Sequence, residues 1–152
     1  MLSVGDRLHE FEAIDNENTT IRSADLIGKK TILCFYPKDN TPGCTAEACS
    51  LNSWLQTLLE KGYTVIGVSP DSVTSHAKFI AKYNLGFRLI ADTDTSLAQK
   101  FGAWGEKSMY GKKYFGILRS TFLIGEDGLI TNVIEKVDTK KHFEQVLGLI
   151  QK

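Results

Sequence analysis

The sequence predicts an α/β fold in which helices flank a mixed central sheet. Two apolar runs of buried-strand type, residues 31–36 and 63–69, lie on either side of a stretch with helical periodicity. That order is typical of a strand–helix–strand unit with parallel strands. Nearer the end of the sequence a Glu-Asp-Gly turn joins two further strand-like runs, which favours an antiparallel hairpin in the same sheet.

The other segments complete this pattern in chain order. After Phe11 we expect a hairpin that turns at residues 15–18, and Cys44 to Lys61 should form one helix that Gly62 ends. The apolar face of that helix comprises Ala48, Leu51, Trp54, Leu55, Leu58 and Leu59. Further expected elements are a helix over 72–86, a strand over 87–92, a helix over 94–102 capped by an aspartate or threonine, a loop over 103–116, the hairpin over 118–135 and a helix over 138–152. We expect residues 1–152 to form a single domain.

Composition narrows the class of protein. The 152 residues are 42% hydrophobic and 24% charged, as in an ordinary soluble globular protein. Lys plus Arg and Asp plus Glu number 18 each, so no net field attracts nucleic acid or an anionic membrane. Apolar runs are too short to span a bilayer, and the first 20 residues do not resemble a signal peptide. We therefore expect a cytoplasmic protein that binds neither nucleic acid nor membrane.

The three cysteines, Cys34, Cys44 and Cys49, are expected to be thiols in such a compartment. Their spacing disfavours a zinc site, because C-x4-C is not a usual metal clip and the three histidines are scattered. The C-x-x-C motif of redox dithiols is absent. Cys34 lies within an apolar strand, so we interpret it as a packing residue. The sequence predicts no metal and no cofactor.

Cys44 is expected at a position that activates a thiol. Thr41 precedes Pro42, and proline is favoured at the first position of a helix, which makes Thr41 the N-cap and puts Cys44 in the first turn. Unpaired backbone N–H groups and the positive end of the helix dipole surround that position. These surroundings favour the thiolate, which is the nucleophilic form of cysteine.

Cys49 follows five residues later on the same predicted helix. In an ideal helix the two side chains are about 7.5 Å apart along the axis and about 140° apart around it. Their Cα atoms would be roughly 8 to 9 Å apart, beyond the limit of about 7 Å for a disulfide. A bond between them therefore requires the first turns, which contain Gly43, to unwind.

The segment FYPKDNTPGCTAEAC resembles the active-site segment of the peroxiredoxins, in particular the bacterioferritin-comigratory or peroxiredoxin Q type. The family pattern P-x-x-x-T-x-x-C is matched by Pro37, Thr41 and Cys44, and the second cysteine of that subgroup by Cys49. The arginine of the family falls on Arg119 in LRSTFLI. The resemblance extends over nearly the whole chain and implies a thioredoxin-like fold with an N-terminal hairpin.

The resemblance also implies a reaction. Cys44 would be the peroxidatic cysteine, which attacks hydrogen peroxide or an organic hydroperoxide and becomes a sulfenic acid. Cys49 would be the resolving cysteine, which condenses with it to give a Cys44–Cys49 disulfide. Thioredoxin or a similar dithiol would reduce that disulfide. The protein would be a monomer or a weak homodimer.

Further residues acquire roles from the same resemblance. Thr41 would hold Cys44 and the peroxide by hydrogen bonds, and Arg119 would stabilise the thiolate and the leaving oxygen. Pro37 would shield the pocket from water. Glu47 would orient Arg119, or would be a solvated surface carboxylate.

Two alternative functions are compatible with the sequence, and the segment 103–116 has two possible interpretations. The same fold could serve a general thiol–disulfide oxidoreductase, or a binding or chaperone module without catalysis; both leave Pro37, Thr41 and Arg119 unexplained. In the segment 103–116, the aromatic residues are interpreted as packing in a loop rather than as a contact for substrate or reductase: Trp104, Tyr110 and Tyr114. Its lysines are interpreted as a solvated face: Lys107, Lys112 and Lys113.

Overall fold

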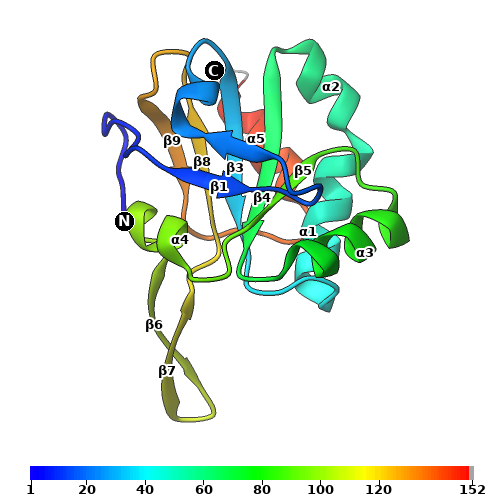
Figure 1. The fold of residues 1–152 in the computed structure, drawn as a ribbon, viewed down its shortest axis with the longest axis vertical. Coiled ribbons are helices and arrows are strands. Elements are labelled where there is room, and N and C mark those ends of the chain that lie inside the picture. The colour runs from blue at the N-terminus through cyan, green and yellow to red at the C-terminus, as the bar shows by residue number, and fades with distance from the viewer. Residues whose placement is uncertain (151–152) are drawn as a thin grey trace.

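A computed structural model describes residues 1–150 and has a five-stranded mixed sheet at its centre (Figure 1). The strand order is β5-β4-β3-β8-β9. The bounds are β3 Lys30–Phe35, β4 Tyr63–Ser69, β5 Arg88–Ala91, β8 Ser120–Ile124 and β9 Ile130–Ile134. β3 pairs in parallel with β4 and antiparallel with β8, so the predicted α/β architecture with a mixed sheet is confirmed.

Helices and a small hairpin cover the two faces of the sheet. One face carries the N-terminal hairpin β1 (Glu12–Ile14) and β2 (Thr20–Arg22), a 3-10 turn and α4 (Ser96–Phe101). The other carries α1 (Pro42–Ser53), α2 (Leu55–Glu60), α3 (Val73–Tyr83) and α5 (His142–Ile150). Side chains of β3 alternate between the two cores, as a strand buried on both faces requires. The last two residues of the helix expected over 138–152 lie outside the described residues.

The helix expected from Cys44 to Lys61 is in fact two helices. α1 ends at Ser53 and α2 begins at Leu55, with Trp54 in a non-helical conformation between them. The Ser53 hydroxyl donates to the carbonyl oxygen of Cys49, an arrangement that bends helices, and the Trp54 ring stacks on Phe143 at 5.1 Å. Trp54 and Leu59 are about half exposed, so their assignment to the buried face was wrong.

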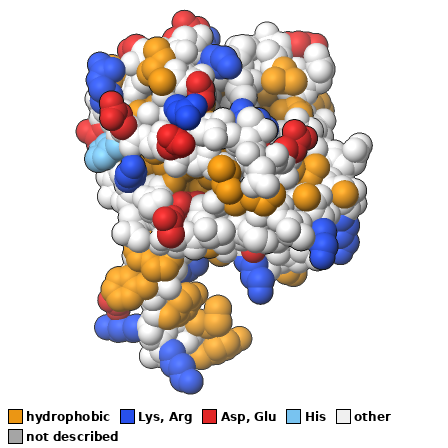
Figure 2. Space-filling view, in the orientation of Figure 1, with side chains coloured by type: hydrophobic (Ala, Val, Ile, Leu, Met, Phe, Trp, Pro, Cys, Tyr) orange, Lys and Arg blue, Asp and Glu red, His pale blue; other side chains and the backbone are white. Residues whose placement is uncertain are grey.

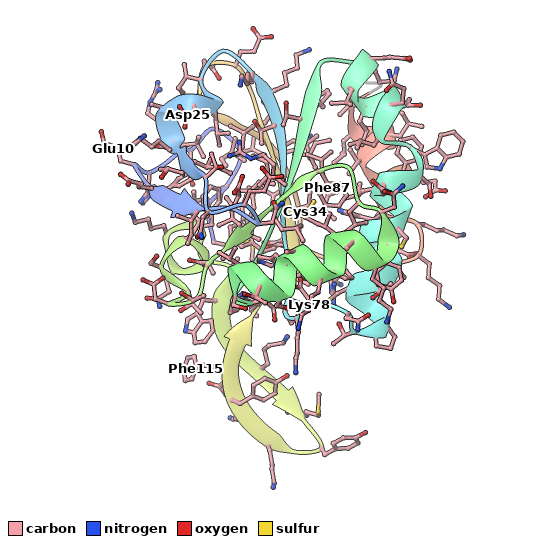
Figure 3. The ribbon with its side chains drawn as sticks, turned by 45° about the vertical axis from the view of Figure 1, so that its right-hand side comes forward. Glu10, Asp25, Cys34, Lys78, Phe87 and Phe115 are labelled. Carbon is pink, nitrogen blue, oxygen red and sulfur yellow. The ribbon has the colours of Figure 1, made fainter. Side chains whose placement is uncertain are left out.

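The segment 103–116, expected as a loop, forms a β-hairpin instead. β6 (Trp104–Met109) and β7 (Lys112–Ile117) pair antiparallel through a tight turn, and this arm projects away from the body of the protein (Figure 1). Tyr110 and Gly111 have positive φ at the two central positions, as a two-residue hairpin turn requires. Orange aromatic and blue lysine side chains cover the arm in Figure 2, and Phe115 points into solvent in Figure 3. Interpreting the aromatic residues as loop packing was therefore wrong for Tyr110, which is 98% exposed.

Other local expectations are confirmed. The N-terminal hairpin turns at Asp15, whose side chain accepts the backbone N–H groups of Glu17 and Thr19. α3 begins at Ser72, which caps it through the N–H of Ser75, and ends at Asn84 in the left-handed conformation. The N-cap of α4, Thr95, accepts no backbone N–H of the helix through its side chain; Asp94 accepts the N–H of Ser96, and Asp92, outside the expected segment, accepts those of the next two residues. Within residues 1–150, no helix is both long and apolar enough to cross a membrane.

Three packed phenylalanines on the hairpin side of the sheet should carry a large share of the stability. Phe122 is fully buried and its ring lies 5.8 Å from that of Phe35 and 5.0 Å from that of Phe101. We expect Phe122→Ala to lower the free energy of unfolding by about 3 to 5 kcal/mol, measured by urea denaturation, because it leaves a cavity. The same substitution at Phe115, which is 66% exposed, is the control and should change it by less than about 0.5 kcal/mol. Equal effects of the two substitutions would contradict this description of the core.

Candidate active site

The end of β3 leads into α1 through a short loop, and this places Cys44 in the first helical turn. Thr41 is the N-cap, with extended backbone angles, and its carbonyl oxygen accepts the N–H of Thr45 at 2.8 Å. Its hydroxyl donates to the carbonyl oxygen of Lys38 at 2.9 Å. The lone pairs of that hydroxyl oxygen therefore stay available as acceptors.

Arg119 brings a fixed positive charge to the sulfur of Cys44. Its Nη2 lies 3.2 Å from Cys44 Sγ, and its Nη1 lies 3.4 Å from Glu47 Oε1. Cys44 is 2% exposed, while the Arg119 side chain is 23% exposed. A guanidinium is charged at any physiological pH, so the sulfur has a cation on one side and the start of a helix on the other. Both are positive and attract negative charge at the sulfur.

Glu47 lies one turn after Cys44 on α1 and is buried. It is 3% exposed, so the alternative of a solvated surface carboxylate is wrong. Burial raises the pKa of Glu47 to about 7, and the charge and hydrogen bond of Arg119 only partly oppose this. At neutral pH the carboxylate is thus about half ionised, and it contacts the terminal nitrogen of the guanidinium that does not face the sulfur.

The remaining predicted residues lie on the same stretch of chain. Cys49 is half-buried and lies on the unbroken helix α1 with Cys44, so the intact helix keeps the two thiols apart. Gly43 packs against the site: a Cβ added there would lie 3.5 Å from Arg119 Nη2. Pro37 is half-buried in the loop between β3 and α1.

Cys34 lies at the centre of the molecule, within β3 (Figure 3). It is 3% exposed, and burial, followed by the charge of Glu47, raises its pKa. His142 Nε2 lies 3.8 Å from its sulfur and 2.9 Å from the hydroxyl oxygen of Thr121. The surroundings keep Cys34 a neutral thiol, as a packing residue should be.

Lys107 is a site neighbour that the sequence analysis missed. It lies on β6, and burial and the charge of Arg119 lower its pKa, while the charge of Cys44 opposes the shift. Lys112 and Lys113 on β7 are exposed as expected, but Lys107 is half-buried and within electrostatic reach of the sulfur. Only the hairpin, which appeared as a loop in the sequence, turns this lysine toward the site.

The chain is similar to known proteins over nearly its whole length. The family model described as AhpC/TSA family matches residues 4–133. The chain is 44% identical over 147 residues to a putative peroxiredoxin bcp of Coxiella burnetii, covering 97% of each protein. It is 40% identical to peroxiredoxin Bcp of Bacillus subtilis over 99% of this chain and 96% of that protein. The chain belongs to the AhpC/TSA family, in its peroxiredoxin Bcp group.

Solved structures of peroxiredoxins share the fold. A cysteine-to-serine mutant of PrxQ from Xylella fastidiosa superposes with a TM-score of 0.93 at 36% identity, covering 99% of this chain and 96% of that one. The bacterioferritin comigratory protein of Xanthomonas campestris, described with alkyl peroxide reduction activity, gives a TM-score of 0.87 at 36% identity, covering 93% and 90%. The thioredoxin-like fold with an N-terminal hairpin is thereby confirmed, and this peroxiredoxin is a peroxidase.

The raised pKa of Glu47 predicts a pH-dependent stability. A carboxyl group that is harder to ionise in the folded state stabilises it fully below about pH 4.5, and the contribution is lost as the pH rises through about 7. The shift corresponds to about 3 kcal/mol. We expect Glu47→Gln, which keeps an acceptor for Arg119, to remove this dependence in urea denaturation between pH 5 and 8. Parallel curves for the variant and the wild type would contradict the assignment.

Proposed function

We propose that this peroxiredoxin reduces hydrogen peroxide and organic hydroperoxides with Cys44 as the peroxidatic cysteine. The observation that carries the proposal is the 3.2 Å contact between Arg119 Nη2 and Cys44 Sγ at the start of α1. The Xanthomonas relative described with alkyl peroxide reduction activity supports the choice of substrate class.

In the first step the Cys44 thiolate attacks the terminal oxygen of the peroxide. The S–O bond forms, the O–O bond breaks, and the other oxygen leaves as hydroxide or alkoxide that takes up a proton. Arg119 stabilises the negative charge as it moves from sulfur to the leaving oxygen. The Thr41 hydroxyl, whose proton is engaged by Lys38, accepts the O–H of the peroxide. Pro37 shields the pocket from water.

In the second step the first turn of α1 opens and the Cys49 thiol attacks the sulfenic sulfur. An S–S bond forms and one water molecule leaves. The start of the helix suits this opening, because Pro42 is exposed and Gly43 favours the unfolded backbone. Ala48 and Leu51 anchor the following turns in the core.

In the third step a dithiol protein such as thioredoxin reduces the Cys44–Cys49 disulfide by thiol exchange and takes over the disulfide. All residues proposed for the cycle lie in one chain, so a monomer can complete it. The accessible position of Cys49 favours this exchange, since it is less buried than Cys44.

Cysteine substitutions test the two roles. We expect Cys44→Ser to abolish peroxide consumption in a thioredoxin-coupled assay, since the nucleophile is gone. Cys49→Ser should still oxidise once, giving a sulfenic acid seen as about 16 mass units by intact mass spectrometry, and then stall with thioredoxin. Cys34→Ser is the control and should retain turnover. Full thioredoxin-dependent turnover by Cys44→Ser would refute the proposal.

Stiffening the first turn of α1 should slow the second step. Gly43→Ala fits sterically, since the new Cβ meets only ordinary contacts, and alanine stabilises a helical turn by about 0.5 to 1 kcal/mol relative to glycine. We expect disulfide formation to slow by about two- to fivefold. More Cys44 should then reach the sulfinic acid at high peroxide, measured by mass spectrometry.

Gly148→Ala provides the control for this substitution. Gly148 lies in α5, where an added Cβ meets no atom within 4 Å, so the same change stabilises a helix that does not open in the cycle. An unchanged rate of disulfide formation in Gly43→Ala, or the same change in both variants, would contradict an opening at the first turn.

A further inference from the structure

One buried carboxylate, that of Asp39, fixes the loop between β3 and α1. Asp39 is 7% exposed, and its Oδ1 accepts the hydroxyl of Tyr36 at 2.6 Å. Its Oδ2 accepts the hydroxyl of Ser75 at 2.8 Å and lies 2.8 Å from Nδ1 of His76. The backbone N–H of Asp39 donates to Asp71 Oδ2 at 2.8 Å. The loop is thus tied to α3 and to the end of β4.

Both ring nitrogens of His76 face polar groups of the protein. Its Nε2 lies 2.9 Å from the carbonyl oxygen of Ile90, which can only accept, so Nε2 carries a proton. Its Nδ1 faces Asp39 Oδ2 at 2.8 Å, so one proton lies in the contact between the imidazole and the carboxyl group. An imidazole that donates from both nitrogens is a cation. His76 is fully buried, so its contact with Asp39 lies inside the protein.

Besides His76, the titratable groups of this cluster come from three segments of the chain. Tyr36 lies after β3, Asp39 lies in the loop, and Asp71 lies between β4 and α3. Burial, followed by the charge of Asp39, raises the pKa of Tyr36, which therefore stays a neutral donor. Lys78 on α3 is exposed and points outward (Figure 3). His76 is thus the basic group that contacts the buried Asp39.

Three side chains here are close enough together to hold a metal ion: Asp39, Asp71 and His76. Their atoms are already committed to partners in the protein. His76 Nδ1 faces a carboxylate oxygen, and Asp71 Oδ2 accepts both the Ser69 hydroxyl and the N–H of Asp39. A metal would have to displace these donors, so the arrangement fits an internal ion pair better.

We propose that His76 is a positioning residue for the peroxide step and acts as a buried cation through Asp39. This inference rests on the proposed role of Cys44. Pro37 precedes Asp39 by two residues, and Thr41 follows it by two, so the anchored carboxylate lies between the two loop residues that face the peroxide. Thr41 further closes the loop onto Lys38. Loss of the His76 charge leaves Asp39 buried without its cation, and the loop shifts.

The contacts of Asp39 that fix the loop affect the first step of the cycle but not the second. They lie before α1, whereas the opening that joins Cys44 to Cys49 takes place inside α1, after Thr41. Weakening these contacts therefore slows the attack on peroxide, which needs Pro37 and Thr41 in place. It does not slow the condensation of the two cysteines, which needs only the first turn to open.

The test is rapid-quench kinetics on His76→Gln, with free thiols alkylated and counted by mass spectrometry. We expect the second-order rate of Cys44 oxidation to fall about tenfold, as misplaced catalytic groups cause. The rate of disulfide formation, which is independent of peroxide concentration, should stay within twofold. Asp92→Asn is the control, because Asp92 is equally buried and caps α4 on the other face of the sheet. Unchanged oxidation, or a slowing of both steps that the control shares, would overturn the proposal.

A measurement on the wild-type protein avoids any folding defect of the variants. In the reduced protein at pH 7, ¹⁵N NMR should show a proton on both ring nitrogens of His76. A single N–H would overturn the buried cation. Should wild-type Cys44 not react with peroxide, the proposed function fails, whereas normal wild-type oxidation with an unaffected His76→Gln defeats this inference alone.

Discussion

The antiparallel pairing of β8 with β3 is the constraint on which the site depends. Phe35, the last residue of β3, pairs with Ser120, the first residue of β8. Because the strands run in opposite directions, the end of β3 and the start of β8 meet at one edge of the sheet. Cys44 follows β3 and Arg119 precedes β8, so this register brings their chain segments to the same edge of the sheet. A slip of one residue would turn Arg119 toward the opposite face, away from α1.

The environment of Arg119 explains why a carboxylate is buried next to it. A fully ionised Glu47 would neutralise the guanidinium and reduce its effect on the sulfur. Burial raises the pKa of Glu47 to about 7, so the carboxylate holds Arg119 in place without cancelling its charge completely. The long contact of 3.4 Å on that side, against 3.2 Å to the sulfur, agrees with this balance. Glu47 thus orients the guanidinium of Arg119 and leaves part of its positive charge to act on the sulfur.

The sequence predicted those elements of the fold that depend on interactions between neighbouring residues. Apolar runs predicted β3 and β4, and the Thr41–Pro42 pair predicted where α1 begins, because these depend on neighbouring residues. The end of α1 at Ser53 depends on stacking of Trp54 against Phe143, almost 90 residues away, and periodicity carries no sign of it. The β6–β7 arm has many glycines and lysines and little alternation of apolar and polar residues, so its strand pairing could not be predicted from the sequence either. The prediction that Arg119 lies near Cys44 came from the family resemblance. The contacts of Asp39 with His76 were not predicted, because they join segments that are distant in the sequence.

Buried contacts lie before and after the first turn of α1, but few lie within it. The site can therefore be held in place although the proposed cycle requires that turn to open. Asp39 holds the chain before the helix, and Ala48 and Leu51 hold it after the first turns. Between these points lie an exposed proline, a glycine and Cys44. Only Cys44 among them is fully buried, and its contact with Arg119 holds the turn closed. Oxidation of the sulfur removes the thiolate that Arg119 stabilises, so the proposed chemistry itself weakens the contact that keeps Cys44 away from Cys49.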